Sequence, residues 1–123
     1  MTVTITLSAP PPSTNNLYAN TPRGRIKSAR YRSWIAAVGW DLKLQKVEKV
    51  GGQVALDIEV ERTSACADVS NRVKALEDLL VAHGVIDDDR NVMDVRVRWA
   101  SIKGCKVSIT PIRDVLPLDS RAA

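Results

Sequence analysis

Residues 67–94, with the sequence ADVSNRVKALEDLLVAHGVIDDDRNVMD, concentrate the side chains of this chain that could do chemistry. One carboxylate, Asp68, stands at the start, and three consecutive carboxylates, Asp87, Asp88 and Asp89, stand near the end. Adjacent carboxylates repel one another, and a divalent cation bound among them relieves that repulsion. Mg²⁺ prefers oxygen ligands and usually takes only one or two protein carboxylates. The pattern therefore indicates a magnesium site that joins the two ends of the stretch.

Ordinary explanations compete with a metal site. An acidic triplet is also typical of a solvated turn, and Asp68 is also typical of a helix start, where the helix dipole favours negative charge. Lys74 lies four residues before Asp78 on the intervening helix, so it can form an ordinary surface ion pair. His83 stands one residue before Gly84, at a helix end where a cation is favoured, and this accounts for it without a catalytic role.

Periodicity places this stretch among strands and helices. Residues 71–83 form an amphipathic helix that ends at Gly84, the residue best suited to the left-handed conformation. Asp68 and Asp89 can meet only if the strands before and after this helix lie side by side, so this arrangement is expected. Alternation of apolar residues predicts strands over residues 2–7, 54–61, 92–100 and 105–112.

A second helix is predicted to begin at Ser28, a favourable N-cap residue, and to run to about residue 46. Trp34 and Trp40 are expected to pack in the core from this helix rather than to stack on bases. The last two strands are expected to form a hairpin that turns at Gly104. The predicted fold class is therefore α+β, a small mixed and mainly antiparallel sheet covered by two helices.

Residues 23–32 are basic and have aromatic neighbours. Cations interleaved with Tyr18 and Tyr31 suit the neutralisation of phosphates, and a solvated basic helix start is the alternative. The net charge of +4 and the pI of about 9.3 favour a polyanionic partner, although many basic proteins bind no nucleic acid. The candidate DNA-binding residues are Arg23, Arg25, Lys27, Arg30 and Arg32, together with Asn71.

The composition is that of one soluble domain. A chain of 123 residues has room for a single core, assigned to residues 1–112, with residues 113–123 as a loose tail. No apolar run approaches the roughly 20 residues that span a bilayer, and no signal peptide is recognised, so a cytoplasmic protein without membrane association is expected. Cys66 and Cys105 are expected to be reduced thiols.

The order Asp-x-x-Asn-x-x-Lys, a helix, Gly-Val-Ile and then Asp-Asp-x-x-Val resembles the RusA family of Holliday junction resolvases. These are metal-dependent endonucleases that cut four-way DNA junctions. The N-terminal segment PPPSTNNLY resembles the opening of the same family, so the similarity covers roughly residues 5–100.

The resemblance implies the roles of the site residues. By position, Asp68, Lys74 and Asp89 match the catalytic residues. Mg²⁺, replaceable by Mn²⁺, would be held by Asp68 and Asp89 with Asp88 as a further candidate, and no small-molecule cofactor is implied. Ser70 stands where the family has a second catalytic aspartate. A neutral hydroxyl is a weak Mg²⁺ ligand, so metal affinity is expected to fall while the fold survives.

The implied function is Mg²⁺-dependent resolution of four-way junctions by paired symmetric nicks in recombination and repair. A symmetric homodimer would supply both active sites at once. The substitution at Ser70 leaves an alternative open, a junction-binding protein on the same scaffold with impaired cleavage. A third possibility is an unrelated basic domain whose acidic turn has no chemical role.

Overall fold

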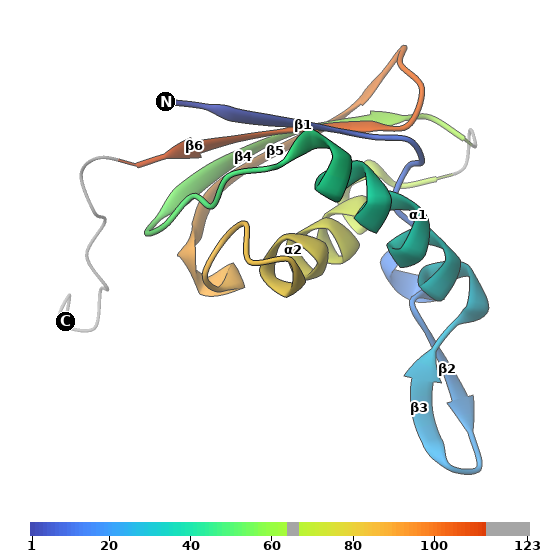
Figure 1. Ribbon diagram of the computed structural model, residues 1–123. Coiled ribbons are helices and arrows are strands. Elements are labelled where there is room, and N and C mark those ends of the chain that lie inside the picture. Colours follow the sequence, from blue (N-terminus) through green and yellow to red (C-terminus); the bar gives the residue numbers. More distant parts are fainter. Residues whose placement is uncertain (64–66, 113–123) are drawn as a thin grey trace, which may run out of the picture.

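One four-stranded sheet carries the core in the computed structural model, which describes residues 1–63 and 67–112 (Figure 1). The strands lie in the order β1-β6-β4-β5. β6 pairs antiparallel with both β1 and β4, whereas β4 and β5 pair in parallel. The strand bounds are Val3–Leu7 for β1, Val54–Glu61 for β4, Val92–Ala100 for β5 and Cys105–Pro111 for β6.

Two helices lie against one face of this sheet (Figure 1). α1, Ala29–Gln45, begins after Ser28, whose hydroxyl accepts a hydrogen bond from the Tyr31 N–H as the sequence predicts. α2, Val73–Ala82, connects β4 to β5. Because the two strands that flank α2 pair in parallel, they form a β-α-β unit, and the expectation that they lie side by side is confirmed. The predicted α+β class is confirmed as well.

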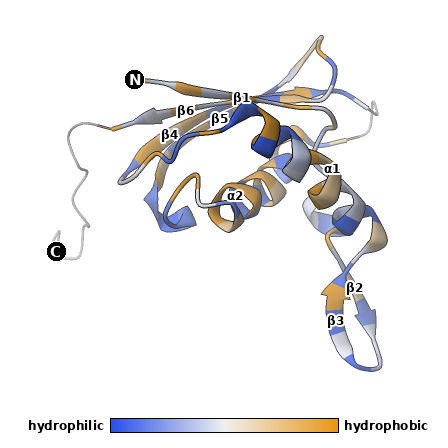
Figure 2. Cartoon of the chain, viewed as in Figure 1, coloured by the Kyte–Doolittle hydropathy of each residue, from blue (hydrophilic) through white to orange (hydrophobic). Residues whose placement is uncertain are grey.

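The core fills the space between the sheet and the helices. Leu76 and Leu80 of α2 are fully buried, and Figure 2 shows α2 as a largely hydrophobic helix. On the opposite face of the sheet, Arg98 pairs with Asp57 at 2.6 Å and with Glu59 at 2.7 Å. The sheet is therefore packed on one face and polar on the other, as the period of two requires. The buried residues of β4 are Val54, Leu56, Ile58 and Val60.

The expected hairpin of the last two strands is wrong, because β4 lies between β5 and β6. Gly104 does adopt a positive φ of 79°. It lies in the connection from β5 to β6, which crosses over β4 rather than joining two neighbouring strands. Its N–H donates to the Glu61 carboxylate at 2.7 Å, and a Cβ at this position would collide with the Leu7 carbonyl oxygen. Only glycine allows this approach.

The expected core position of Trp40 is also wrong. Trp34 is 5% exposed, and its indole N–H donates to the Ala9 carbonyl at 3.1 Å, whereas Trp40 is 65% exposed with the Lys43 ammonium 5.2 Å from its ring centroid. Six residues advance an α-helix by about 600°, or about 240° round its axis, so both indoles cannot face the core.

The basic segment forms a hairpin that the sequence analysis did not predict. β2, Tyr18–Thr21, and β3, Gly24–Lys27, pair antiparallel as a separate two-stranded sheet before α1 (Figure 1). The alternative of a basic helix start is therefore wrong for residues 23–27. Gly24 has a φ of 110°, and the pair closes where the Ser28 N–H donates to the Leu17 carbonyl at 2.9 Å.

Other expectations concern the membrane, the thiols and the tail. Within residues 1–63 and 67–112, no helix has the length and hydrophobicity needed to cross a bilayer. Cys105 is a free thiol, and burial raises its pKa to about 12. Cys66 and the predicted tail, residues 113–123, lie outside the described residues.

Candidate functional site

Lys74, in the first turn of α2, lies beside the segment that leads into β5. Its Nζ is 3.1 Å from the Asp78 Oδ1 and 3.8 Å from the Asp89 Oδ2. Asp89 begins a short 3-10 turn, η3 (Asp89–Asn91), directly before β5. The ordinary pair with Asp78 therefore exists, and the same ammonium also reaches Asp89. The fold brings together two predicted site residues from opposite ends of the motif.

The acidic triplet divides between two surroundings. Asp87 pairs with Lys49 at 2.7 Å, and this cation holds the pKa of Asp87 below its usual value. Asp88 caps η3, because its carboxylate accepts the Arg90 N–H at 3.0 Å. This backbone bond and the neighbouring Asp89 carboxyl group lower the pKa of Asp88. Asp88 Oδ2 also lies 3.2 Å from the Arg90 guanidinium, whereas Asp89 reaches Lys74 and Asp87 is paired with Lys49.

Glu77 and Asp78, both on α2, act on Lys74 together with Asp89. Burial, and next the charge of Asp89, raise the pKa of Glu77. The hydrogen bond to Asp78 is the main cause of the raised pKa of Lys74. The site is therefore strongly negative, and Lys74 offsets part of that charge. Sequence reasoning gave Asp78 only an ion pair and passed over Glu77, although their spacing of three and four residues from Lys74 places them on its side of the helix.

The start of the motif lies in a tighter turn than predicted. Residues 69–72 form a 3-10 turn, η2 (Val69–Arg72), and Asp68 precedes it, exposed and without a side-chain capping bond. Ser70 is exposed, and the Asn71 carbonyl accepts the Thr14 hydroxyl at 2.9 Å. In the described part of the chain, no three carboxylate, histidine or cysteine side chains are grouped to hold a metal ion. The convergence of Asp68 with Asp89 stays a prediction.

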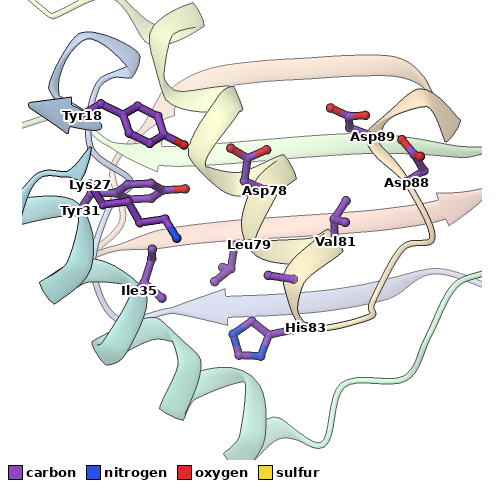
Figure 3. Close-up of a pocket in the computed structure, with 11 residues that line it drawn as sticks. Tyr18, Lys27, Tyr31, Ile35, Asp78, Leu79, Val81, His83, Asp88 and Asp89 are labelled. Atoms are coloured by element: carbon purple, nitrogen blue, oxygen red, sulfur yellow. The ribbon is translucent and has the colours of Figure 1, made fainter. Parts of the chain in front are cut away.

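A cleft of about 460 Å³ opens between α1, α2 and the hairpin (Figure 3), and its lining includes Asp78 and Asp89, the two ion-pair partners of Lys74. Tyr18, Tyr31 and Lys27 form one side of it, and Asp78 lies in the middle. Burial, followed by the charge of Asp78, raises the pKa of Tyr31 to about 12. The cleft thus has an aromatic and basic side, and its opposite side is acidic. The acidic side is made by Asp88 and Asp89.

The predicted DNA-binding cations lie on the hairpin and at the start of α1, whereas Asn71 lies in η2. Arg25 borders a second hollow of about 340 Å³ together with Lys74, and its guanidinium lies 4.4 Å from the Tyr18 ring centroid. Lys27 borders the larger cleft. The remaining cations, exposed at the hairpin turn and on the first turn of α1, are Arg23, Arg30 and Arg32.

One known family matches most of the chain. The family described as endodeoxyribonuclease RusA matches residues 8–110 of the chain. The matched range runs from the end of β1 into β6 and includes Asp68, Lys74 and Asp89. No curated protein matches the sequence significantly.

Proposed function

The chain belongs to the RusA family of junction-resolving endodeoxyribonucleases, and we propose that it resolves four-way DNA junctions by Mg²⁺-dependent paired nicks. The observation that carries this proposal is the approach of Lys74 to Asp89, at 3.8 Å. These residues come from the two ends of the family motif and meet beside a cleft whose opposite side is basic and aromatic. Recombination and repair are the processes in which such junctions are resolved.

The donor set fits a hydrated Mg²⁺ ion. Mg²⁺ needs only one or two protein carboxylates and keeps several waters, and the adjacent carboxyl groups of Asp88 and Asp89 meet this requirement. Asp68 is the further ligand that the family motif assigns. Bound Mg²⁺, or Mn²⁺ in its place, would lower the pKa of a ligand water and so supply the hydroxide for hydrolysis.

The residues of the chain itself hold and neutralise the DNA. The Lys74 side chain is 47% exposed, so its ammonium can turn from the carboxylates toward a phosphate and offset the charge that develops on it. Arg25 and Lys27 would bind the phosphates that flank the scissile one. A symmetric homodimer would present two such sites to the two strands cut at a junction.

A junction-binding protein with impaired cleavage is the second candidate function. Ser70 supplies no carboxylate, and the Asp87 side chain is already paired with Lys49 at 2.7 Å. The DNA-binding cations are unaffected by this difference. Binding would therefore persist while the metal is held less firmly.

Synthetic DNA separates these functions. The purified protein is incubated with an end-labelled four-way junction and with linear duplexes of the same arm sequences, in Mg²⁺, Mn²⁺ or EDTA. Symmetric paired nicks in the junction alone support the nuclease. Selective binding without nicks in either metal supports the second candidate, and the absence of both refutes the two. Light scattering of the protein with and without junction checks the expected dimer.

A further inference from the structure

The β2–β3 hairpin has two chemically different faces. Residues directly opposite one another in an antiparallel pair lie on the same face, and successive residues alternate between faces. The pairing register therefore divides the hairpin into a charged face, made of Tyr18, Asn20, Arg25 and Lys27, and an uncharged face, made of Ala19, Thr21 and Ile26.

The charged face borders the candidate site. Tyr18 and Lys27 point into the cleft that also contains Asp89 (Figure 3), and Arg25 shares the second hollow with Lys74. The uncharged face consequently points away from the site. Ile26 is 45% exposed there, and no charged residue of the two strands shares its face.

The hairpin is held as an arm rather than as a loose loop. At its root, Ser28 donates from its N–H to the Leu17 carbonyl at 2.9 Å and from its hydroxyl to the Asn16 carbonyl at 2.6 Å. At its tip, the Thr21 hydroxyl donates to the Gly24 carbonyl at 2.7 Å. Figure 1 shows the arm extending away from the sheet and α2. Two strands alone are marginally stable, so these anchors preserve its shape.

The charge of the surroundings identifies the partner as nucleic acid. Residues 1–40 contain five cations and no carboxylate, and the first acidic residue of the chain is Asp41. All the charged residues near Ile26 in the sequence are cations. This combination suits a partner that offers phosphates beside flat apolar surfaces. A branch point leaves the flat face of a base pair unstacked, and DNA-binding proteins are known to insert apolar side chains such as Ile or Pro between base pairs.

We propose that the hairpin enters the branch point of the junction as a wedge. Its uncharged face packs Ile26 against the last base pair of one arm, while its charged face holds the strand to be cut beside Lys74. This rests on the proposed nuclease function and assigns one determinant of its selectivity for branched DNA. In a continuous duplex a base step must first be unstacked at a cost, so Ile26 gains its contact preferentially at a branch point.

Ile26→Asn tests the wedge, with Leu44→Asn as the matched control. Leu44 is 77% exposed on α1, so both variants replace a surface aliphatic residue and should unfold at the wild-type temperature. Kd is measured in EDTA for a four-way junction and for a linear duplex, and 2-aminopurine at the branch point reports unstacking. The wild-type protein is expected to raise 2-aminopurine fluorescence on binding the junction. Ile26→Asn is expected to weaken junction binding by about tenfold, to leave duplex binding within about twofold, and to abolish this rise in fluorescence. Leu44→Asn is expected to change none of these.

Ile26→Leu is expected to retain junction binding, because the wedge needs an aliphatic side chain of similar volume. Equal losses on junction and duplex in Ile26→Asn, or no loss on either, would overturn the proposal. Wild-type binding without a change in 2-aminopurine fluorescence would overturn it too. These measurements contain no divalent metal, so a failure of the nuclease itself appears separately, as missing nicks by the wild-type protein in Mg²⁺ and Mn²⁺.

Discussion

The two carboxylates that share Lys74 provide a matched pair of variants. Asp89→Asn removes the proposed metal ligand, whereas Asp78→Asn removes the carboxylate nearer to the ammonium, at 3.1 Å against 3.8 Å. The two side chains are 45% and 30% exposed. Both changes therefore remove one negative charge beside the same ammonium, from side chains of similar exposure. They differ in that Asp89 is a proposed metal ligand and Asp78 is not.

The expected magnitudes separate the two roles. An ion pair between partly exposed groups contributes about 0.2–1 kcal/mol, so each variant should unfold within about 4 °C of the wild type. Loss of a group that stabilises charge in the transition state costs about 2.7 kcal/mol or more, which is about 100-fold in rate. Asp89→Asn should therefore nick junctions at least about 100-fold more slowly, and Asp78→Asn should stay within about fivefold.

Three measurements check this comparison: the single-turnover nicking rate at saturating Mg²⁺, the junction Kd in EDTA, and the thermal unfolding temperature. Neither variant should bind the junction more weakly, because each loses a negative charge near the phosphates. Equal rate losses in both variants would show that Asp89 acts only by positioning Lys74. An unimpaired Asp89→Asn would exclude Asp89 as a ligand, and loss of junction binding would make its carboxylate structural.

Three further outcomes are expected. Ser70→Asp restores the carboxylate of the family motif and should raise the nicking rate, and an unchanged rate would place this position outside the site. Arg25→Ala combined with Lys27→Ala should weaken junction and duplex binding alike and reduce the slope of log K against log salt by about 2; an unchanged slope would remove the hairpin from the interface. Burial raises the pKa of Tyr31 to about 12, so the stability that its neutral phenol contributes is complete below about pH 10 and is lost as pH rises through about 12. Absorbance at 295 nm in a Tyr18→Phe variant should show this titration, and a midpoint near 10 would contradict the burial.

The sequence predicted that the strands flanking α2 lie side by side, but not that they pair in parallel or that β6 lies next to β4. The alternation of apolar residues marks a strand on each side of α2. The proposed meeting of Asp68 and Asp89 requires these two strands to be neighbours, so both arguments gave the same arrangement. Gly104 carries the same local signal whether the chain turns into a neighbouring strand or crosses one. The difference lies in the Leu7 carbonyl and the Glu61 carboxylate that surround it, and these are distant in sequence.

The β2–β3 hairpin was not predicted from the sequence, for a different reason. Its faces are a charged one and an uncharged one, both exposed, so no hydrophobic period of two marks residues 18–27. The available signal was the turn chemistry of Pro22 and Gly24 between two short segments. Trp40 shows the converse error, because its residue type favours burial while its helical position faces solvent.

The charges around Lys74 define what the substitution at Ser70 changes. Even without a carboxylate there, the charge of Asp89 helps to raise the pKa of Glu77, so the site already repels further negative charge and attracts cations. The negative potential of the carboxylates around Lys74 attracts a metal ion without fixing its position. A carboxylate at position 70 would fix the position of the ion but would add little to this potential. On the proposed assignment, Ser70 would therefore weaken the placement of the metal more than its attraction. For this reason the gain in rate from Ser70→Asp is expected to persist at saturating Mg²⁺.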